Sequence, residues 1–129
     1  MTRYEAESAT LSAGGTVDAD HAGHSGTGFA NATNAVGSYG EWTVTAAAAG
    51  AASLSFGYAN ATAATRPVDL SVNGQVVASG VTFPATGAWT TWSALTRTAS
   101  LTAGANTVRV TATTADGPAN LDYLDVSAP

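Results

Sequence analysis

Residues 68–77 read VDLSVNGQVV, and this short stretch has the pattern of a β-hairpin. Apolar side chains alternate with polar ones in its first half, as expected for a strand that buries one face. They are Val68, Leu70 and Val72. Asn73 and Gly74 follow, and this dipeptide strongly favours a two-residue turn because both residues tolerate positive φ angles. The stretch therefore predicts two neighbouring antiparallel strands.

The same alternation recurs along the chain, and no segment has a clear helical period. The other segments with strand character are 41–46, 53–59, 78–83, 92–101, 107–113 and 120–126. With the first residues and the Gly-rich breaks included, we count about eight or nine short strands. This number and spacing predict an all-β domain, an antiparallel β-sandwich of two sheets of the jelly-roll type.

Length and composition narrow the possibilities further. The 129 residues suit one domain, residues 1–129, with its own core. The formal net charge is −5 and only four basic residues are present, so a nucleic-acid surface is not expected. No apolar run is long enough for a membrane span, and no cysteine is available for disulfides. We expect a monomer.

The segment 15–40 has the weakest pattern in the chain. It is rich in Asp, Asn, His, Ser and Gly, which supply oxygen ligands or form turns. Compact domains rarely carry so long an irregular stretch without a role in binding or function. We therefore expect a function here, and a surface loop without a role is the alternative.

Acidic residues cluster at the two ends of the chain. Glu5 and Glu7 lie two residues apart, which would place them on one face of a first strand. Asp122 and Asp125 lie on the last strand, and first and last strands often pair because chain termini tend to be close. Such a cluster would suit a hard cation, best of all calcium. The alternative, solvated acids that protect a sheet edge, stays open at this point.

Catalytic interpretations find little support. Glu5 and Glu7 on one strand face would point the same way and would not flank a sugar, as a glycosidase requires. His21 and His24 share one loop, without the further ligands of a zinc site or the acid partner of a catalytic triad. A calcium-dependent lyase or esterase would rest on Arg66 alone. We therefore predict that the domain is not an enzyme.

Two residues near the predicted loops suit sugar recognition. Trp89 follows a turn, where its ring would be exposed at a loop tip and free to stack on the apolar face of a pyranose. Trp42 and Trp92 are expected to pack inward instead. Asn120 lies where a loop becomes a strand, and its amide can donate to and accept from sugar hydroxyls.

Seven segments, taken in order, resemble a carbohydrate-binding module of family 35, close to family 6. They are YEAES, SGTGF, GSYGEWTV, RPVDLSVNG, TGAWTTW, AGANTVRVTA and NLDYLDV. Each segment is weakly specific alone, but the ordered series covers nearly the whole chain. The resemblance implies a non-catalytic β-sandwich of a secreted, extracellular enzyme that acts on polysaccharides. The catalytic module would lie in the same parent polypeptide.

The resemblance also implies a structural calcium and a sugar site in the loops at one end of the sandwich. Glu5, Glu7 and Asp122 would hold the calcium, helped by an oxygen from around Thr27. These are expectations carried over from the family.

At the sugar site the resemblance assigns stacking to Trp89 and hydrogen bonding to Asn120. Family 6 modules place a second aromatic ring on the other side of the sugar. Here the nearest equivalent position is Val36, and Tyr39 is close to it in sequence.

Some family 35 modules bind a terminal uronic acid through a second calcium in the sugar site. Asp18, Asp20, Asn31 and Asn34 could supply oxygens for it, and Arg66 could form a forked pair with the sugar carboxylate. The predicted function is calcium-dependent binding of glucuronic or unsaturated galacturonic acid at a polysaccharide chain end, which targets a linked hydrolase or lyase. The alternatives are a module for a neutral sugar (a galactose, mannose, xylose or glucosamine polymer) and a spacer without a sugar site.

Overall fold

Alternation of buried and exposed side chains persists along the long strands of the computed structural model, which describes residues 1–129. The elements are β1 Thr2–Glu5, a 3-10 helix Ala6–Ser8, β2 Thr10–Leu11, β3 Thr16–Asp18, β4 Phe29–Asn31, β5 Tyr39–Ala46, β6 Gly50–Ala59, β7 Val68–Val72, β8 Gln75–Val81, β9 Ser93–Leu101, β10 Gly104–Ala112 and β11 Asn120–Ser127. Because of this alternation, strands such as β5, β7 and β10 have one face toward the core and one toward solvent, whereas β11 is buried along almost its whole length.

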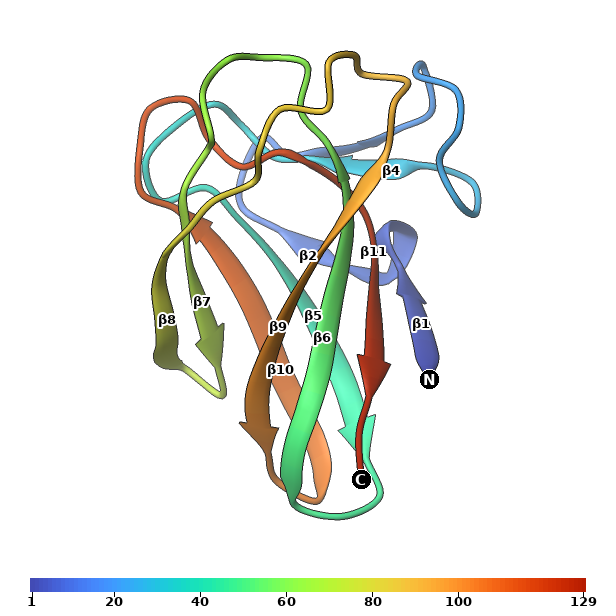
Figure 1. Cartoon of the computed structure of the whole chain (residues 1–129), viewed down its shortest axis with the longest axis vertical. Helices are drawn as coiled ribbons and strands as arrows, with labels where there is room; N and C mark the ends of the chain where they lie inside the picture. The colour runs from blue at the N-terminus through green and yellow to red at the C-terminus, as the bar shows by residue number, and fades with distance from the viewer.

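These strands form two antiparallel sheets packed face to face (Figure 1). The six-stranded sheet has the order β3-β4-β11-β6-β9, with β1 also paired to β11. The five-stranded sheet has the order β2-β5-β10-β7-β8. Large side chains from both sheets fill the space between them and are almost inaccessible to solvent, among them Trp42, Phe56, Leu70, Phe83 and Leu124. The predicted all-β sandwich is confirmed.

The strand number differs slightly from the expected eight or nine. The structure has 11 strands because residues 2–31 contribute β1, β2, β3 and β4. These strands are only two to four residues long, too short for alternation to reveal them. The weakly patterned segment 15–40 thus contains a small antiparallel pair, in which Asp18 lies opposite Phe29.

The hairpin at residues 68–77 is confirmed. Val72 lies opposite Gln75, and the two residues between them make the turn. Asn73 and Gly74 have φ angles of 52° and 80°, the left-handed values that a type I′ turn requires. No helix in the structure is long and apolar enough to span a membrane.

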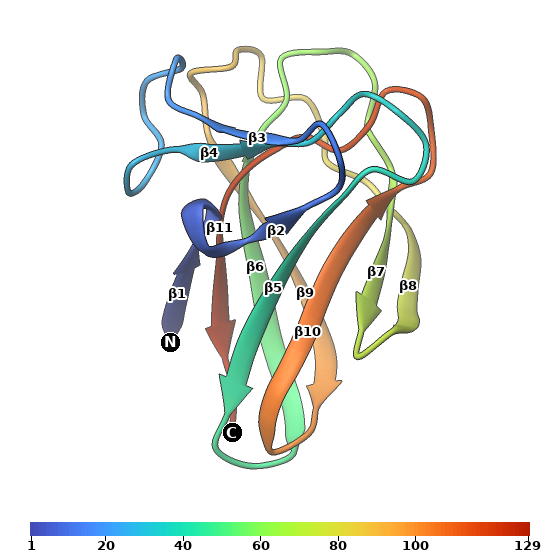
Figure 2. The same ribbon diagram turned by 180° about the vertical axis from the view of Figure 1, so that it is seen from behind.

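The two ends of the sandwich are built differently (Figures 1 and 2). The connections β3–β4, β4–β5, β6–β7, β8–β9 and β10–β11 gather at one end, here called the loop end. The short turns β5–β6 and β9–β10 lie at the other, the turn end, together with the C-terminus. Any side chains on the long connections are therefore collected at the loop end.

Candidate functional site

The loop end brings together three of the predicted sugar-binding residues. Trp89 lies in the β8–β9 connection and Arg66 in the β6–β7 connection. Asn120 begins β11 and pairs with Ala59, the last residue of β6. The guanidinium carbon of Arg66 lies 5.5 Å from the centre of the Trp89 ring. Residues from three separate parts of the sequence thus share one surface.

Arg66 is a buried cation held mainly by carbonyl oxygens. Only 7% of the residue is exposed. Its Nη1 donates to the carbonyl oxygens of Asp116, at 2.7 Å, and Pro118, at 3.1 Å. Burial lowers the pKa of Arg66 from its ordinary value, and the charge of Asp116 acts in the opposite direction. A guanidinium still remains protonated at neutral pH, because its ordinary pKa is above about 12.

Arg66 takes part in neither ion pair of the protein. Those pairs join Arg3 to Asp125 and Arg109 to Glu41, each at 2.8 Å. The positive charge at the loop end is therefore not neutralised by a carboxylate in direct contact.

Trp89 is half-buried, and its ring is supported by the β3–β4 connection. His21 stacks on it, with ring centres 6.1 Å apart and an interplanar angle of 25°. Trp92 packs on Phe29 at 5.3 Å and donates from Nε1 to the carbonyl oxygen of Ala22 at 2.9 Å. Sequence reasoning treated His21 only as a loop residue. The segment that contains His21 has no clear pattern, so nothing in the sequence indicated that this side chain would lie against Trp89.

Asn120 is buried, yet its amide is not used to hold the loops together. The side-chain hydrogen bonds that tie this end of the sandwich come from other residues, among them Tyr58, Asn60, Thr62, Arg66 and Thr86. The amide of Asn120 therefore keeps its capacity to donate and accept.

The two positions considered for a second aromatic ring at the sugar site, those of Tyr39 and Val36, have different surroundings. The Tyr39 ring is covered by the Arg109 guanidinium, whose central carbon lies 3.7 Å from the ring centre. That face of Tyr39 is thus occupied within the protein. Val36 lies in the β4–β5 connection and is 67% exposed.

The residues expected to bind a second calcium are not gathered into one group. Asp18 accepts a hydrogen bond from the amide of Asn31 across the β3–β4 pair, at 2.9 Å. Asn34 instead faces Arg66, with 3.4 Å between its Oδ1 and the guanidinium Nη1. Asp20 is exposed.

Glu5 and Glu7 do not share a strand face, so this part of the sequence prediction is wrong. β1 ends at Glu5, and the 3-10 helix Ala6–Ser8 follows because the chain turns to bury Ala6 completely. The turn nevertheless brings the two carboxylates together beside Gly26. A Cβ atom on Gly26 would lie 2.5 Å from Oε2 of Glu7 and 2.9 Å from Oε2 of Glu5.

Asp122 joins this acidic group from β11. The register of β11 against β6 shifts between Leu121 and Tyr123, so Asp122 occupies a bulge. Its carboxylate accepts two contacts from the Ser25 amide, at 2.9 and 2.8 Å. The predicted pairing of first and last strands is confirmed, with Glu5 opposite Tyr123.

Segment 25–27 threads between the acidic side chains. The hydroxyl of Ser25 donates to Oε1 of Glu5 at 2.6 Å, and the amide of Thr27 donates to Oε2 of Glu7 at 3.0 Å. Asp125 lies outside this group, because its carboxylate is held by two hydrogen bonds from Arg3, at 2.8 and 2.9 Å.

The electrostatics of this group favour a cation. Oε2 of Glu5 is a buried oxygen without a hydrogen-bond partner. Burial raises the pKa of Asp122 to about 6; the amide of Ser25 opposes this shift and repulsion from Glu5 adds to it. The oxygen donors fit a hard cation. In this structure no group of three or more His, Asp or Glu side chains is placed so that it could hold a metal ion. A bound cation would therefore need these carboxylates to move closer together and other oxygens, such as those of Thr27, to contribute.

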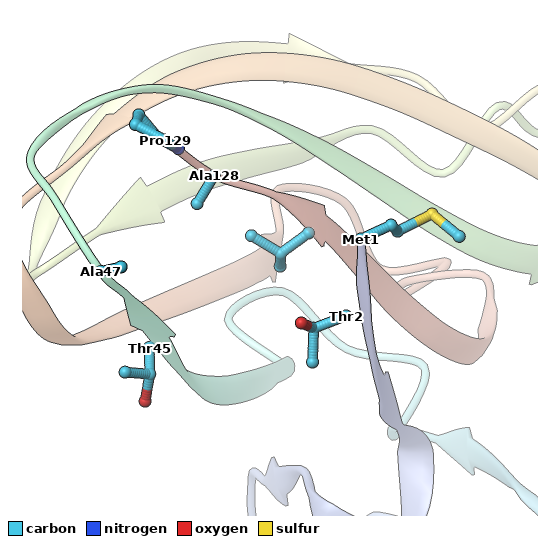
Figure 3. A pocket seen from close by; sticks show the side chains of 7 residues that line it. Met1, Thr2, Thr45, Ala47, Ala128 and Pro129 are labelled. Carbon is cyan, nitrogen blue, oxygen red and sulfur yellow. The ribbon is translucent and has the colours of Figure 1, made fainter.

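The two cavities of the structure lie away from Trp89. One, of about 200 Å³, is at the turn end between the two termini, and no aromatic or charged side chain lines it (Figure 3). The other, of about 300 Å³, lies on the outer face of the five-stranded sheet beside Arg109. A ligand held by Trp89 would therefore rest on an open surface at the loop end.

Comparisons with known proteins agree with the fold and identify the family. The family model described as carbohydrate binding module (family 6) matches residues 5–128. A family 35 carbohydrate-binding module from Clostridium thermocellum superposes with a TM-score of 0.95 and 41% identity, over 99% of this chain and 98% of that one. A module named Xyl-CBM35, solved with a disaccharide that contains glucuronic acid, gives 0.90 and 38%, over 99% and 94%.

A curated relative shows where such a sequence occurs. The exo-β-D-glucosaminidase of Amycolatopsis orientalis is 48% identical over 121 residues, which is 94% of this chain and 12% of the enzyme. The chain thus spans only a small part of that enzyme. It belongs to the carbohydrate-binding modules, as a non-catalytic module of the family 35 type within the group that the family 6 model describes.

Proposed function

We propose that this module binds a uronic acid, glucuronic or unsaturated galacturonic acid, at the end of a polysaccharide chain. The observation that carries the proposal is Arg66, a buried guanidinium beside Trp89 that no carboxylate of the protein pairs with directly. A buried cation attracts an anion more strongly than an exposed one, because water screens it less. A neutral sugar would make no use of this charge.

The other residues of the surface fit the same ligand. The ring of Trp89 would stack on the apolar face of the sugar, a contact of about 1–3 kcal/mol by comparison with other aromatic anchors. The amide of Asn120 would bond to hydroxyl groups. The similarity to Xyl-CBM35, solved with a disaccharide containing glucuronic acid, supports this assignment.

A glucosamine polymer is the second candidate, because the relative from Amycolatopsis orientalis is an exo-β-D-glucosaminidase. The charge of Arg66 argues against it, since a protonated amino sugar would be repelled. The net charge of −5 would favour such a cation only at long range.

Titration calorimetry with three sugars separates these possibilities. Glucuronic acid is the expected ligand, glucuronamide is its uncharged counterpart, and glucosamine is the cationic competitor. We expect glucuronic acid to bind at least about tenfold more tightly than glucuronamide, the ratio that 1.4 kcal/mol of charge interaction gives. Equal binding of the two would remove the role of Arg66, and tighter binding of glucosamine would replace the proposed ligand.

We also propose a structural calcium held by Glu5, Glu7 and Asp122, with an oxygen from Thr27. The unpartnered Oε2 of Glu5 and the raised pKa of Asp122 support it, because both reflect negative charge that lacks compensation. When bound, calcium would neutralise this charge and fix segment 25–27. Melting curves in calcium and in EDTA test the proposal, since an ion that binds only to the folded state raises the melting temperature.

The dependence of sugar binding on calcium is a separate part of the proposal. A second calcium held by Asp18, Asp20 and Asn34 would require Asp18 to leave Asn31 and Asn34 to turn from Arg66. Repeating the glucuronic acid titration in EDTA decides this point. Binding that disappears only in EDTA would support a metal in or beneath the sugar site.

We infer that the module targets a linked, secreted hydrolase or lyase to its polysaccharide. The similarity to a small part of a much longer glucosaminidase supports this arrangement. A spacer without a sugar site would show no binding to any sugar of the panel.

A further inference from the structure

Asn60 is a completely buried polar residue at the loop end, directly after β6. Its Nδ2 donates to the carbonyl oxygens of Ala64, at 2.7 Å, and Phe83, at 2.9 Å. Its Oδ1 accepts from the amide of Thr62, at 3.1 Å, and from the Thr62 hydroxyl, at 2.6 Å. Both donor positions and both acceptor positions of the amide are therefore used.

One set of contacts leads from Asn60 to Arg66. The Thr62 hydroxyl, which donates to Asn60, accepts a hydrogen bond from Nε of Arg66 at 3.2 Å. Arg66 in turn donates to the carbonyl oxygen of Pro118, two residues before Asn120. The guanidinium is thus fixed from both sides, by the β6–β7 connection and by the β10–β11 connection.

A second set of contacts leads from Asn60 to Trp89. The backbone amide of Asn60 donates to the hydroxyl oxygen of Thr86 at 3.0 Å, and the amide of Thr86 donates back to the Asn60 carbonyl at 2.8 Å. The Thr86 hydroxyl donates to the carbonyl oxygen of Ala88, the residue before Trp89, at 3.0 Å. Figure 1 shows the two connections, green and gold, side by side at the top of the molecule.

We infer that Asn60 is a positioning residue for the sugar site, with Thr62 as its link to Arg66. Its side chain joins the connection that carries the cation, through Thr62 and Ala64, to the connection that carries the stacking ring, through the carbonyl oxygen of Phe83. Arg66 and Trp89 are then already held in position before the sugar binds. Because the two connections need less ordering on binding, the entropic cost of binding is smaller. The inference rests on the proposed function of the loop end.

The chain contains a matched control for Asn60. Asn106 is 1% exposed and lies in β10 near the turn end. Its Nδ2 donates to the carbonyl oxygens of Thr102 and Gly104, at 2.9 and 3.0 Å, and its Oδ1 accepts from the amide and hydroxyl of Thr102. Its Oδ1 also accepts from Nδ2 of Asn73, at 2.9 Å, a contact that Asn60 has no counterpart for. The two asparagines thus have similar burial and similar backbone partners, but only Asn60 adjoins the connections that carry Trp89 and Arg66.

The test compares Asn60→Ala, Thr62→Val, Thr62→Ser and Asn106→Ala by melting temperature and by calorimetric titration with glucuronic acid. Asn60→Ala and Asn106→Ala should both lower the melting temperature, since each leaves buried groups unpaired. Only Asn60→Ala and Thr62→Val should weaken binding, by about tenfold, the effect of one lost hydrogen bond. Thr62→Ser keeps the hydroxyl and should bind like the parent protein.

Two results would overturn the inference: parental affinity in both Asn60→Ala and Thr62→Val, or an equal loss of affinity in Asn106→Ala. Thr62→Val covers the case in which Asn60→Ala does not fold, because valine has the shape of threonine and the site is only half-buried.

A second readout is independent of the ligand. Hydrogen exchange of the Thr62 and Phe83 amides should become faster in Asn60→Ala, because the Asn60 side chain accepts from the first and bonds the carbonyl oxygen of Phe83, and should stay unchanged in Asn106→Ala. If the parent protein bound no uronic acid, the proposed function would fail while this exchange pattern still decided the positioning role. Unchanged exchange in Asn60→Ala would overturn the inference even if uronic acid bound.

Discussion

The loop end and the turn end of this sandwich each close around a buried asparagine, Asn60 at one and Asn106 at the other. In both places the amide satisfies carbonyl and amide groups of a nearby connection. The turn end holds a short turn with small side chains, and no aromatic or charged side chain lines its cavity. The loop end presents Trp89 and Arg66.

The difference shows that an ordered connection is not itself a binding site. Buried amides stabilise connections at both ends in the same way, because an unpaired polar group in the core costs about 1–3 kcal/mol. The proposed recognition needs, in addition, a partly accessible ring and a positive charge that no carboxylate of the protein pairs with. Only the loop end has both.

The strongest test of this contrast is Trp89→Ala. We expect the affinity for glucuronic acid to fall more than about tenfold, because the stacking surface is lost. The melting temperature should change little, since the ring is half-buried on the surface and not in the core. Calorimetry and a melting curve on one sample measure both. Unchanged affinity would show that the loop end does not bind the sugar through this ring.

Calcium gives the next largest effect. The β3–β4 connection contains His21, which stacks on Trp89, and also segment 25–27, which contacts the acidic group. A bound ion would therefore restrict the motion of a connection that supports the Trp89 ring. We expect calcium at a hundredfold excess over its Kd to stabilise the parent protein by about 2.7 kcal/mol. Asp122→Asn should lose this stabilisation.

Asp125→Asn is the control for Asp122→Asn. Asp125 is also buried and acidic on β11, but it pairs with Arg3 and not with the acidic group. Its variant should be less stable and still respond fully to calcium in the melting curves. An equal calcium response in both variants would exclude Asp122 as a ligand.

Two glycines extend the comparison between the ends. Gly26 and Gly104 have φ angles of 57° and 92°, so a Cβ at either strains the backbone by about 1 kcal/mol. At Gly26 that Cβ would also lie 2.5 Å from Oε2 of Glu7, whereas at Gly104 it meets nothing within 4 Å. We expect Gly26→Ala to reduce the calcium-induced rise in melting temperature and Gly104→Ala to keep it. A full rise in Gly26→Ala would place the ion elsewhere.

The smallest expected effect is the pH dependence of the calcium-free protein. The pKa of Asp122 is about 6 in the folded state, above the value of about 3.9 for an unfolded chain. The folded state then binds more protons between these values, so it loses stability as the pH rises through 6. In EDTA, Asp122 should make the free energy of unfolding about 1 kcal/mol lower at pH 7 than at pH 5.

Denaturant titrations at the two pH values measure this change, and Asp122→Asn should not show it. The same pH dependence in the parent protein and in the variant would assign it to other groups.

Much of the fold could be predicted from local patterns. Alternation at Val68, Leu70 and Val72 marked a half-buried strand, and the Asn73-Gly74 turn fixed its partner. Alternation has a period of two residues and needs several of them, so β2, with two residues, gave no signal. The ordered family motifs indicated a carbohydrate-binding module, which the comparisons confirm.

The acidic group could be predicted in part. Residue types indicated Glu5, Glu7, Asp122 and Asp125, but Asp125 is held by Arg3 outside the group. They did not indicate the turn at Ala6 or the bulge that aims Asp122 at Ser25. Both features result from packing of the terminal strands, which no short stretch of sequence encodes.

The sequence alone determined which side chains are candidates for sugar recognition, because the ring of Trp89 after a turn and the amide of Asn120 are properties of side chains and local turns. Only the tertiary structure decided how Arg66 and Asn60 serve them. The Arg66 guanidinium is held by Asp116, 50 residues away, and the amide of Asn60 by Phe83, 23 residues away. A buried polar group takes its partners from whatever backbone the fold brings beside it, so its role follows from the packing of distant connections.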